Sequence, residues 1–214
     1  MRLVAITDIH DRFDEAADIV RRWAPVDVLV VGGDITTNGT PADVERAVAL
    51  WRPLANRLLA VAGNMDSPAI DATLVRLGVS LDGRAQQVDD LAFFGCSAAP
   101  VAIGTPYEVP EEELSARIQR GWTEARGSPR QVFVPHAPPR GVLDRTSTGI
   151  AAGSRAVRQF VDEHQPALVL CGHIHEARGQ AQSGRSLVVN CGAAARGHYA
   201  VVEVTAVGFA VRLG

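Results

Sequence analysis

The chain has 214 residues, of which 47% are hydrophobic and 21% charged, and it contains no apolar stretch long enough to span a bilayer. This composition is typical of one soluble globular domain with a substantial core. The 21 basic and 24 acidic residues give a net charge of −3 and form no basic stripe, which argues against binding to duplex nucleic acid.

The first part of the chain alternates between strand-like and helix-like segments. Met1 leads directly into the first strand, without the length or cleavage site of a signal peptide, so we expect a cytoplasmic protein. Thr40-Pro41 and Ser67-Pro68 each have the order of a helix start, with a capping hydroxyl before a proline. This alternation predicts parallel strands joined by crossover helices. The predicted strands are residues 3–7, 26–31 and 58–62, and the helices cover about 13–23, 41–50 and 68–77.

The rest of the chain is richer in strands. Loops are expected at residues 99–110 and 135–153, and helices at about 111–126 and 154–163. Because no repeat, low-complexity stretch or linker interrupts the sequence, residues 1–214 are predicted to form a single α/β domain. The three widely spaced cysteines fit neither a disulfide framework nor a zinc ribbon, so we expect buried thiols at Cys96, Cys171 and Cys191. The further strands are predicted at 85–88, 91–95, 131–134, 167–171, 187–190, 199–204 and 209–213.

Polar side chains follow five of the predicted strands at the point where each strand ends. Strands of an α/β sheet place their carboxyl ends at one edge, where ligands bind, so we expect these side chains to share one crevice. Imidazole, carboxylate and amide donors without a thiolate suit Mn²⁺, Fe or Zn²⁺. Seven donors are too many for one ion but suit two ions that share a carboxylate. The residues are Asp8, His10, Asp34, Asn64, His136, His173 and His175.

Each of these residues has an ordinary structural explanation when it is taken alone. Asp8 could cap the following helix, Asp34 could belong to a strand-end turn, and His136 could be a loop histidine. Their joint occurrence in order, each at the end of a predicted strand, favours a metal centre over these separate explanations.

The same residues form five short motifs, Asp8-x-His10, Gly33-Asp34, Gly63-Asn64-x-Asp66, His136 and Gly172-His173-x-His175. Together they resemble the signature of the calcineurin-like metallophosphoesterases, and the resemblance extends from Leu3 to about Tyr199. The stretches HAPPRGVLDR and LVLCGHIHEARG look closer to the predicted phosphoesterases related to the bacterial Icc protein.

The resemblance implies an α/β fold, a four-layer αββα sandwich in which two mixed β-sheets are flanked by helices. It also implies two divalent metal ions, with Mn²⁺ as the first expectation and Fe or Zn²⁺ as alternatives. The first ion would be held by Asp8, His10, Asp34 and His175. The second would be held by Asp34, Asn64, His136 and His173, so that Asp34 bridges the two ions.

Such a centre would define the chemistry. Two divalent ions about 3.5–4 Å apart can share a water molecule, lower its pKa and direct the resulting hydroxide at phosphorus. The positive charge that two aspartates leave uncompensated suits a phosphate ester. This reaction needs no protein nucleophile, so it is compatible with a chain whose 21 basic residues are all arginine.

One position departs from the family pattern. Many members have a histidine after the asparagine of the third motif, where it is thought to protonate the leaving oxygen; here the residue is Met65, whose thioether has no titratable proton. General acid catalysis contributes about 10²–10⁴-fold, so its absence is expected to favour diesters with activated or strained leaving groups. Asp66 is expected to orient a ligand such as His10, or to cap the helix near Ser67. The predicted catalytic residues are Asp34, Asn64 and Asp66.

Four residues are candidates for contact with the substrate. Arg140 could contact phosphate from a Gly/Pro-rich loop, and His198 could reach the cleft. Asn38 could line the pocket floor, and Met65 occupies the place of the missing histidine. For each of them, a solvated loop residue is the alternative interpretation.

We predict a dinuclear-metal phosphoesterase that hydrolyses small phosphodiesters through a metal-bridging hydroxide, with cyclic nucleotides as substrates by family analogy. One alternative is a protein-interaction scaffold, like the retromer subunit that has this fold. Another is a nuclease, but the net charge of −3 argues against binding to a nucleic-acid duplex. No membrane association is expected, and self-association into a homo-oligomer stays open.

Overall fold

The first three strands and helices follow the order that the sequence predicts. Strands β1 (Arg2–Ile6), β2 (Val28–Gly32) and β3 (Arg57–Val61) are parallel, and a helix follows each of them. Thr40 caps α2 through a reciprocal pair of hydrogen bonds with Asp43. The helices are α1 (Phe13–Arg21), α2 (Pro41–Trp51) and α3 (Pro68–Arg76), with a short 3₁₀ turn, η1 (Arg52–Leu54), before β3.

A second sheet is built from the middle of the chain. Four parallel strands form its centre, and an antiparallel strand closes each edge. The central strands are β5 (Leu91–Cys96), β8 (Arg130–Pro135), β9 (Leu168–Cys171) and β11 (Ser186–Asn190). The edge strands are β4 (Ala85–Val88) and β10 (Gly179–Ser183), and the helices of this half are α4 (Glu111–Ala125) and α5 (Arg155–His164).

Three short strands in two segments differ from the expectation. The segment Gly179–Ser183 reads GQAQS and lacks the β-branched and aromatic residues that mark a strand, yet it forms β10 by pairing with the strongly apolar β11. The expected loop at 99–110 contains a two-residue parallel pair, β6 (Ala99–Pro100) and β7 (Glu108–Val109). These strands form through backbone pairing with a neighbouring segment, and their residues show no alternation or enrichment typical of a strand. The sequence therefore contains no signal for them.

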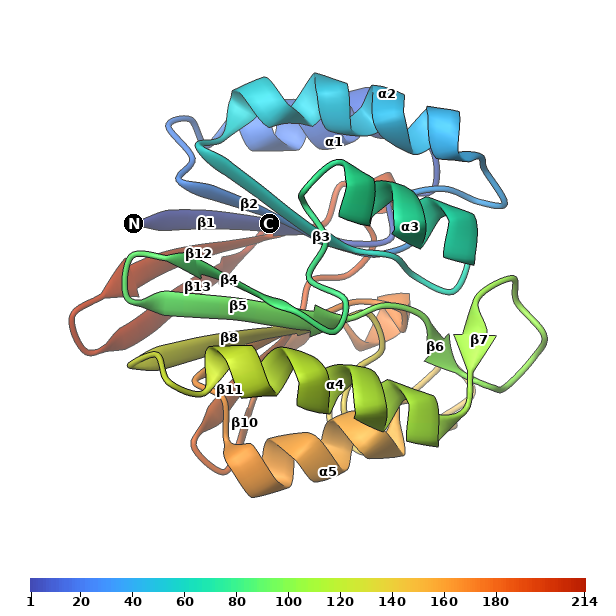
Figure 1. Cartoon of the computed structure of the whole chain (residues 1–214), viewed down its shortest axis with the longest axis vertical. Helices are drawn as coiled ribbons and strands as arrows, with labels where there is room; N and C mark the ends of the chain where they lie inside the picture. The colour runs from blue at the N-terminus through green and yellow to red at the C-terminus, as the bar shows by residue number, and fades with distance from the viewer.

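The computed structural model describes residues 1–214 and has four layers (Figure 1). At the end of the chain, β12 (Ala200–Thr205) pairs antiparallel with β1, and β13 (Gly208–Leu213) pairs with β12. The first sheet therefore has the order β13-β12-β1-β2-β3, and the second has the order β10-β11-β9-β8-β5-β4. Helices α1 to α3 cover the outside of the first sheet, and α4 and α5 cover the outside of the second. This arrangement is the αββα sandwich that the resemblance implies.

The parallel strands are buried on both faces, which explains their continuous apolar sequences. In β2, Val28 and Val30 belong to the core between the two sheets, whereas Leu29 and Val31 belong to the core beneath the helices. The three cysteines are buried and unpaired, as expected. None of the helices combines the length and the apolar character needed to cross a membrane.

The close approach of the two sheets requires a glycine at position 95 in β5. A Cβ atom on Gly95 would lie 2.6 Å from the Val134 carbonyl oxygen and 2.7 Å from Val61 Cγ1 in the opposite sheet. We expect Gly95→Ala to lower the free energy of unfolding by about 1–3 kcal/mol because the core is already filled. Urea denaturation would measure this. Gly127→Ala is the matched control, since a Cβ there meets nothing within 4 Å. Equal midpoints for the two variants would contradict the prediction.

Candidate metal centre

The polar residues that follow the strands come together at one end of the sandwich, but they belong to both sheets. Asp8, Asp34 and Asn64 follow β1, β2 and β3 of the first sheet. His136 and His173 follow β8 and β9 of the second sheet. The expectation of a single sheet edge was therefore wrong in detail. Two sheets that pack face to face bring their carboxyl ends together in the same way as one continuous sheet would.

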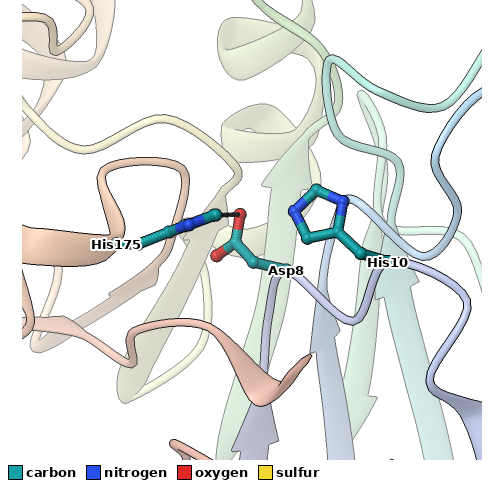
Figure 2. Close-up of side chains that lie close together, drawn as sticks. All are labelled: Asp8, His10 and His175. Carbon is teal, nitrogen blue, oxygen red and sulfur yellow. Dashed lines mark ion pairs between the residues drawn. The ribbon is translucent and has the colours of Figure 1, made fainter. Parts of the chain in front are cut away.

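Asp8, His10 and His175 form the first group of donors (Figure 2). Their donor atoms all lie within 4.8 Å of one another, and His175 Nε2 is 3.2 Å from Asp8 Oδ1. His10 Nδ1 lies 2.9 Å from Thr37 Oγ1, which leaves its Nε2 free to face the centre. His175 begins a short 3₁₀ turn, η2 (His175–Ala177), and not a strand.

Asn64, His136 and His173 form the second group. Asn64 Oδ1 lies 2.9 Å from His136 Nε2 and 2.8 Å from His173 Nδ1. His136 Nδ1 lies 2.8 Å from the Gly32 carbonyl oxygen, to which it must donate its proton. A neutral His136 therefore directs its Nε2 lone pair at the acceptor oxygen of Asn64. Two acceptor lone pairs that face the same point repel each other. A cation at that point would attract both of them, so the arrangement would become favourable.

Asp34 lies between the two groups. Its Oδ1 is 3.5 Å from His136 Nε2, and its Oδ2 is 3.8 Å from His10 Nε2. The Met65 N–H donates to Asp34 Oδ1 at 2.7 Å, so the carboxylate is held in place by the backbone of the third motif. One carboxylate thus presents one oxygen to each set of donors.

The electrostatics fit divalent ions. Asp8 and Asp34 are 0% and 3% exposed, and burial raises the pKa of Asp34 to about 7. Burial also opposes ionisation of Asp8, but the hydrogen bond from His175 and the neighbouring imidazoles lower its pKa to about 2. Burial lowers the pKa of His173 to about 3, which keeps this imidazole neutral and its lone pair available. Two adjacent buried carboxylates are costly without compensating positive charge, and a divalent cation would supply it.

The backbone turns sharply at this site. Left-handed conformations are costly for residues other than glycine, although Asp, Asn and His tolerate them better than most. Four of the seven donors are non-glycine residues in this conformation, so the backbone is strained where it delivers them to the centre. These residues are Asp8 (φ 54°), His10 (φ 48°), Asp34 (φ 47°) and His173 (φ 66°).

Asp66 has a different role from both expected ones. It is 1% exposed, forms no hydrogen bond with His10 or with the backbone at the start of α3, and accepts hydrogen bonds from the backbone N–H groups of Gly63, Ile35 and Thr36. It also accepts from the Thr36 hydroxyl. Burial raises the pKa of Asp66, while these donors favour its ionised form. Asp66 therefore ties the loop that follows Asp34 to the turn that carries Asn64.

Three threonines hold the donors and were not found from the sequence. Thr7 Oγ1 lies 2.6 Å from Asp8 Oδ2, and Thr37 supports His10 as described. Thr105 Oγ1 accepts from Asn64 Nδ2 at 3.1 Å, which fixes the orientation of that amide. Hydroxyl residues next to motif residues give no distinctive signal, and Thr105 is 41 residues away from Asn64 in the chain.

Five of the seven donors, all but Asp8 and His136, line a cavity of about 830 Å³. Of the four candidate substrate-binding residues, Met65 and Arg140 line this cavity. Asn38 does not line it, since its exposed side chain lies outside and its N–H donates to the Met65 carbonyl oxygen at 3.0 Å. His198 does not line it either, and its Nδ1 is buried without a hydrogen-bond partner just after the turn η3 (Ala194–Arg196). Neither Asn38 nor His198 is therefore among the residues that line this cavity.

Comparison with known proteins places the chain in a family. Residues 1–177 match the family model for the calcineurin-like phosphoesterases, and the chain belongs to this family. An uncharacterised protein of Methanocaldococcus jannaschii is 28% identical over 89% of this chain and 87% of its own. A Synechococcus protein named as a probable cyclic nucleotide phosphodiesterase is 27% identical over 91% of this chain and 81% of its own. The crystal structure of the TT1561 protein of Thermus thermophilus shares the fold, with a TM-score of 0.76, 16% identity, and coverage of 99% and 97% of the two chains.

The role of Asp66 can be tested with Asp66→Asn. Each carboxylate oxygen accepts two hydrogen bonds, so the amide nitrogen of Asn would face two donors. We expect the free energy of unfolding to fall by about 1–3 kcal/mol and the affinity for Mn²⁺ to fall roughly 10–100-fold. Chemical denaturation without metal and calorimetric titration with Mn²⁺ would measure the two effects. Asp14→Asn, at an exposed position of α1, should change neither. A variant at position 66 that behaves like this control would refute the assignment.

Proposed function

We propose that the protein is a divalent-metal-dependent phosphodiesterase that hydrolyses small phosphodiesters. The observation that carries this proposal is the position of Asp34, which presents one carboxylate oxygen to each of two sets of donors. A cleft at the carboxyl ends of the strands with room for two ions is suited to the in-line hydrolysis of a phosphate ester. The convergence of all seven donors favours hydrolysis over a purely scaffolding role, for which the donors need not be kept.

The seven donors would bind two metal ions. Asp8, His10 and His175 would hold one ion, Asn64, His136 and His173 would hold the other, and Asp34 would contact both. When bound, divalent ions supply a water molecule of lowered pKa and positive charge for the phosphoryl oxygens. We propose Mn²⁺ as the metal, with Fe and Zn²⁺ as alternatives that suit the same donors.

The chain itself positions the donors and the substrate. The peptide N–H of Met65 holds the Asp34 carboxylate, and Thr105 holds the Asn64 amide, so these donors keep their places when substrate enters. Arg140 lies exposed on the cavity wall, where its guanidinium could contact a phosphate oxygen. The Met65 thioether cannot donate a proton, so this position does not help the leaving group depart. These features support diesters with good or strained leaving groups, and the name of the Synechococcus relative makes cyclic nucleotides one candidate class.

Removal of the central carboxylate should abolish the activity. We expect wild-type protein loaded with Mn²⁺ to hydrolyse bis(p-nitrophenyl) phosphate, and Asp34→Asn to reduce kcat/KM by at least about 100-fold. Elemental analysis should give close to two ions per wild-type chain and fewer in the variant. Asp89→Asn, an exposed position far from the donors in sequence, is the control and should retain both properties. Metal-loaded wild-type protein that hydrolyses no phosphoester with any divalent ion would rule the proposal out.

The absence of a proton donor at position 65 makes a separate prediction. We expect Met65→His to raise turnover of an unactivated phosphomonoester such as phenyl phosphate by about tenfold or more, because an imidazole at this position can protonate the leaving oxygen. Turnover of a p-nitrophenyl diester should change much less, since its leaving group needs little help. Steady-state kinetics on both substrates would measure the difference. An equal change on both substrates would mean that the proton reaches the leaving group by another route.

A further inference from the structure

Exposed apolar side chains gather at the mouth of the cavity. The chain has five large hydrophobic residues with exposed side chains, and Val101, Ile103 and Ile150 are three of them, with 67%, 86% and 64% of their surface exposed. All three line the cavity that contains the donors. Single exposed hydrophobic residues are ordinary on a protein surface, but a group of them around one cavity points to a binding site. We call these three residues the apolar mouth.

The loop that carries Val101 and Ile103 is built to hold them in this position. Between β6 and β7 the chain wraps around the carboxylate of Glu108, which accepts hydrogen bonds from four backbone N–H groups and from the Thr105 hydroxyl. These hydrogen bonds lower the pKa of Glu108 to about 2, although partial burial opposes them, so the loop keeps its acceptor at neutral pH. Thr105 in the same loop also holds the Asn64 amide, which ties the apolar mouth to the donors.

Ile150 comes from a different loop, between β8 and α5. Its N–H donates to Thr146 Oγ1 at 3.1 Å, and the Thr146 N–H donates to its carbonyl oxygen at 2.9 Å. This closed turn fixes the backbone that carries the exposed side chain. The apolar mouth is therefore formed by two separately stabilised loops that both border the cavity.

The charged residues of the cavity wall divide into two kinds. The acidic side chains of Glu108, Glu111 and Glu176 line it, but each accepts hydrogen bonds from backbone N–H groups, with Glu111 bound to the start of α5. Arg140 and Arg155 line it as well, and their guanidinium groups have no hydrogen-bond or ion-pair partner within the protein. The wall thus offers apolar surface and positive charge, while its negative charge is already engaged.

We propose that the natural substrate is a phosphodiester with an apolar aryl or alkyl group, and that this group binds at the apolar mouth while the phosphate lies at the donors. The inference rests on the proposed function, because it concerns the same cavity. Met65 adds apolar surface close to the donors, since it lines the cavity and its N–H donates to the Asp34 carboxylate. A thioether at this position can pack against a hydrocarbon group, whereas an imidazole is better suited to a polar one. A polar nucleoside would leave the apolar mouth without a partner.

A series of diesters with one common leaving group would test the inference. We would compare p-nitrophenyl phosphodiesters whose second ester group is methyl, hexyl, phenyl or thymidine, so that only the non-reacting group differs. Each buried methylene strengthens binding about fourfold, so kcat/KM for the hexyl ester should exceed that for the methyl ester by at least about tenfold. The phenyl ester should likewise exceed the thymidine ester. A preference for thymidine, or equal values for methyl and hexyl, would overturn the inference.

Serine substitutions would place the effect at the apolar mouth. In the triple variant Val101→Ser, Ile103→Ser, Ile150→Ser, the ratio of hexyl to methyl kcat/KM should fall close to one. The three side chains are exposed, so little packing is lost. Val207→Ser is the matched control, because Val207 is 98% exposed and does not line the cavity, and it should keep the wild-type ratio. A triple variant with the wild-type ratio would contradict the assignment of these residues.

A binding measurement separates this inference from the proposed activity. Methyl and hexyl phosphonate cannot be hydrolysed at the P–C bond, so calorimetric titration of Mn²⁺-loaded protein reports binding alone. Tighter binding of the hexyl compound supports the inference even if no ester is hydrolysed, and hydrolysis without any effect of chain length supports only the activity. Sedimentation velocity tests a different occupant of the same surface. Concentration-dependent dimerisation that is lost in the triple variant would show that the apolar mouth contacts a second copy, and would overturn the inference.

Discussion

The carboxylate of Asp34 sets the constraint on which the rest of the site depends, because it must lie between two sets of donors while buried from water. A buried carboxylate is stable only if fixed partners surround it. The peptide N–H of Met65 supplies one such partner, and Asp66 ties the loop that follows Asp34 to the turn that carries Asn64 through backbone N–H groups. Much of the polar structure near the centre therefore serves to place one side chain.

This placement also explains where the fold is strained. The donors after β1 and β2 lie where the chain leaves each strand, and the backbone turns sharply there. Asp8, His10 and Asp34 adopt left-handed conformations that few other residue types tolerate. The two sheets behind them are closely packed and apolar, and their stability offsets the strain at their ends. The packed sheets and the strained turns thus hold the donors close together, although their negative charges and lone pairs repel one another.

The long loops determine which side chains surround the cavity in front of the donors. The donors define a chemistry that many proteins of one fold can share, whereas loops in general vary more in length and composition than the strands that they connect. In this chain, the segments that follow β6 and β8 place Val101, Ile103 and Ile150 around the cavity and hold them there by hydrogen bonds to Glu108 and Thr146. Met65 fits the same apolar environment. It places a thioether close to the donors, where many members of the family have a histidine. On the proposal made above, the inner end of the cavity would bind the phosphate and its outer end the group attached to it.

Strong local patterns made the helices, the buried strands and the donor residues predictable, because each depends on neighbours within a few positions or on residue types that suit metals. Strand β10 could not be predicted, since its polar sequence becomes a strand only through pairing with β11. The partners of Asp66, the support of Asn64 by Thr105, and the positions of Asn38 and His198 outside the cavity also depend on segments that meet only after folding. The sequence by itself determined which atoms are available to hold ions. Only the tertiary structure decided which of them face a common point, because that depends on how two sheets pack and how the chain turns at their ends.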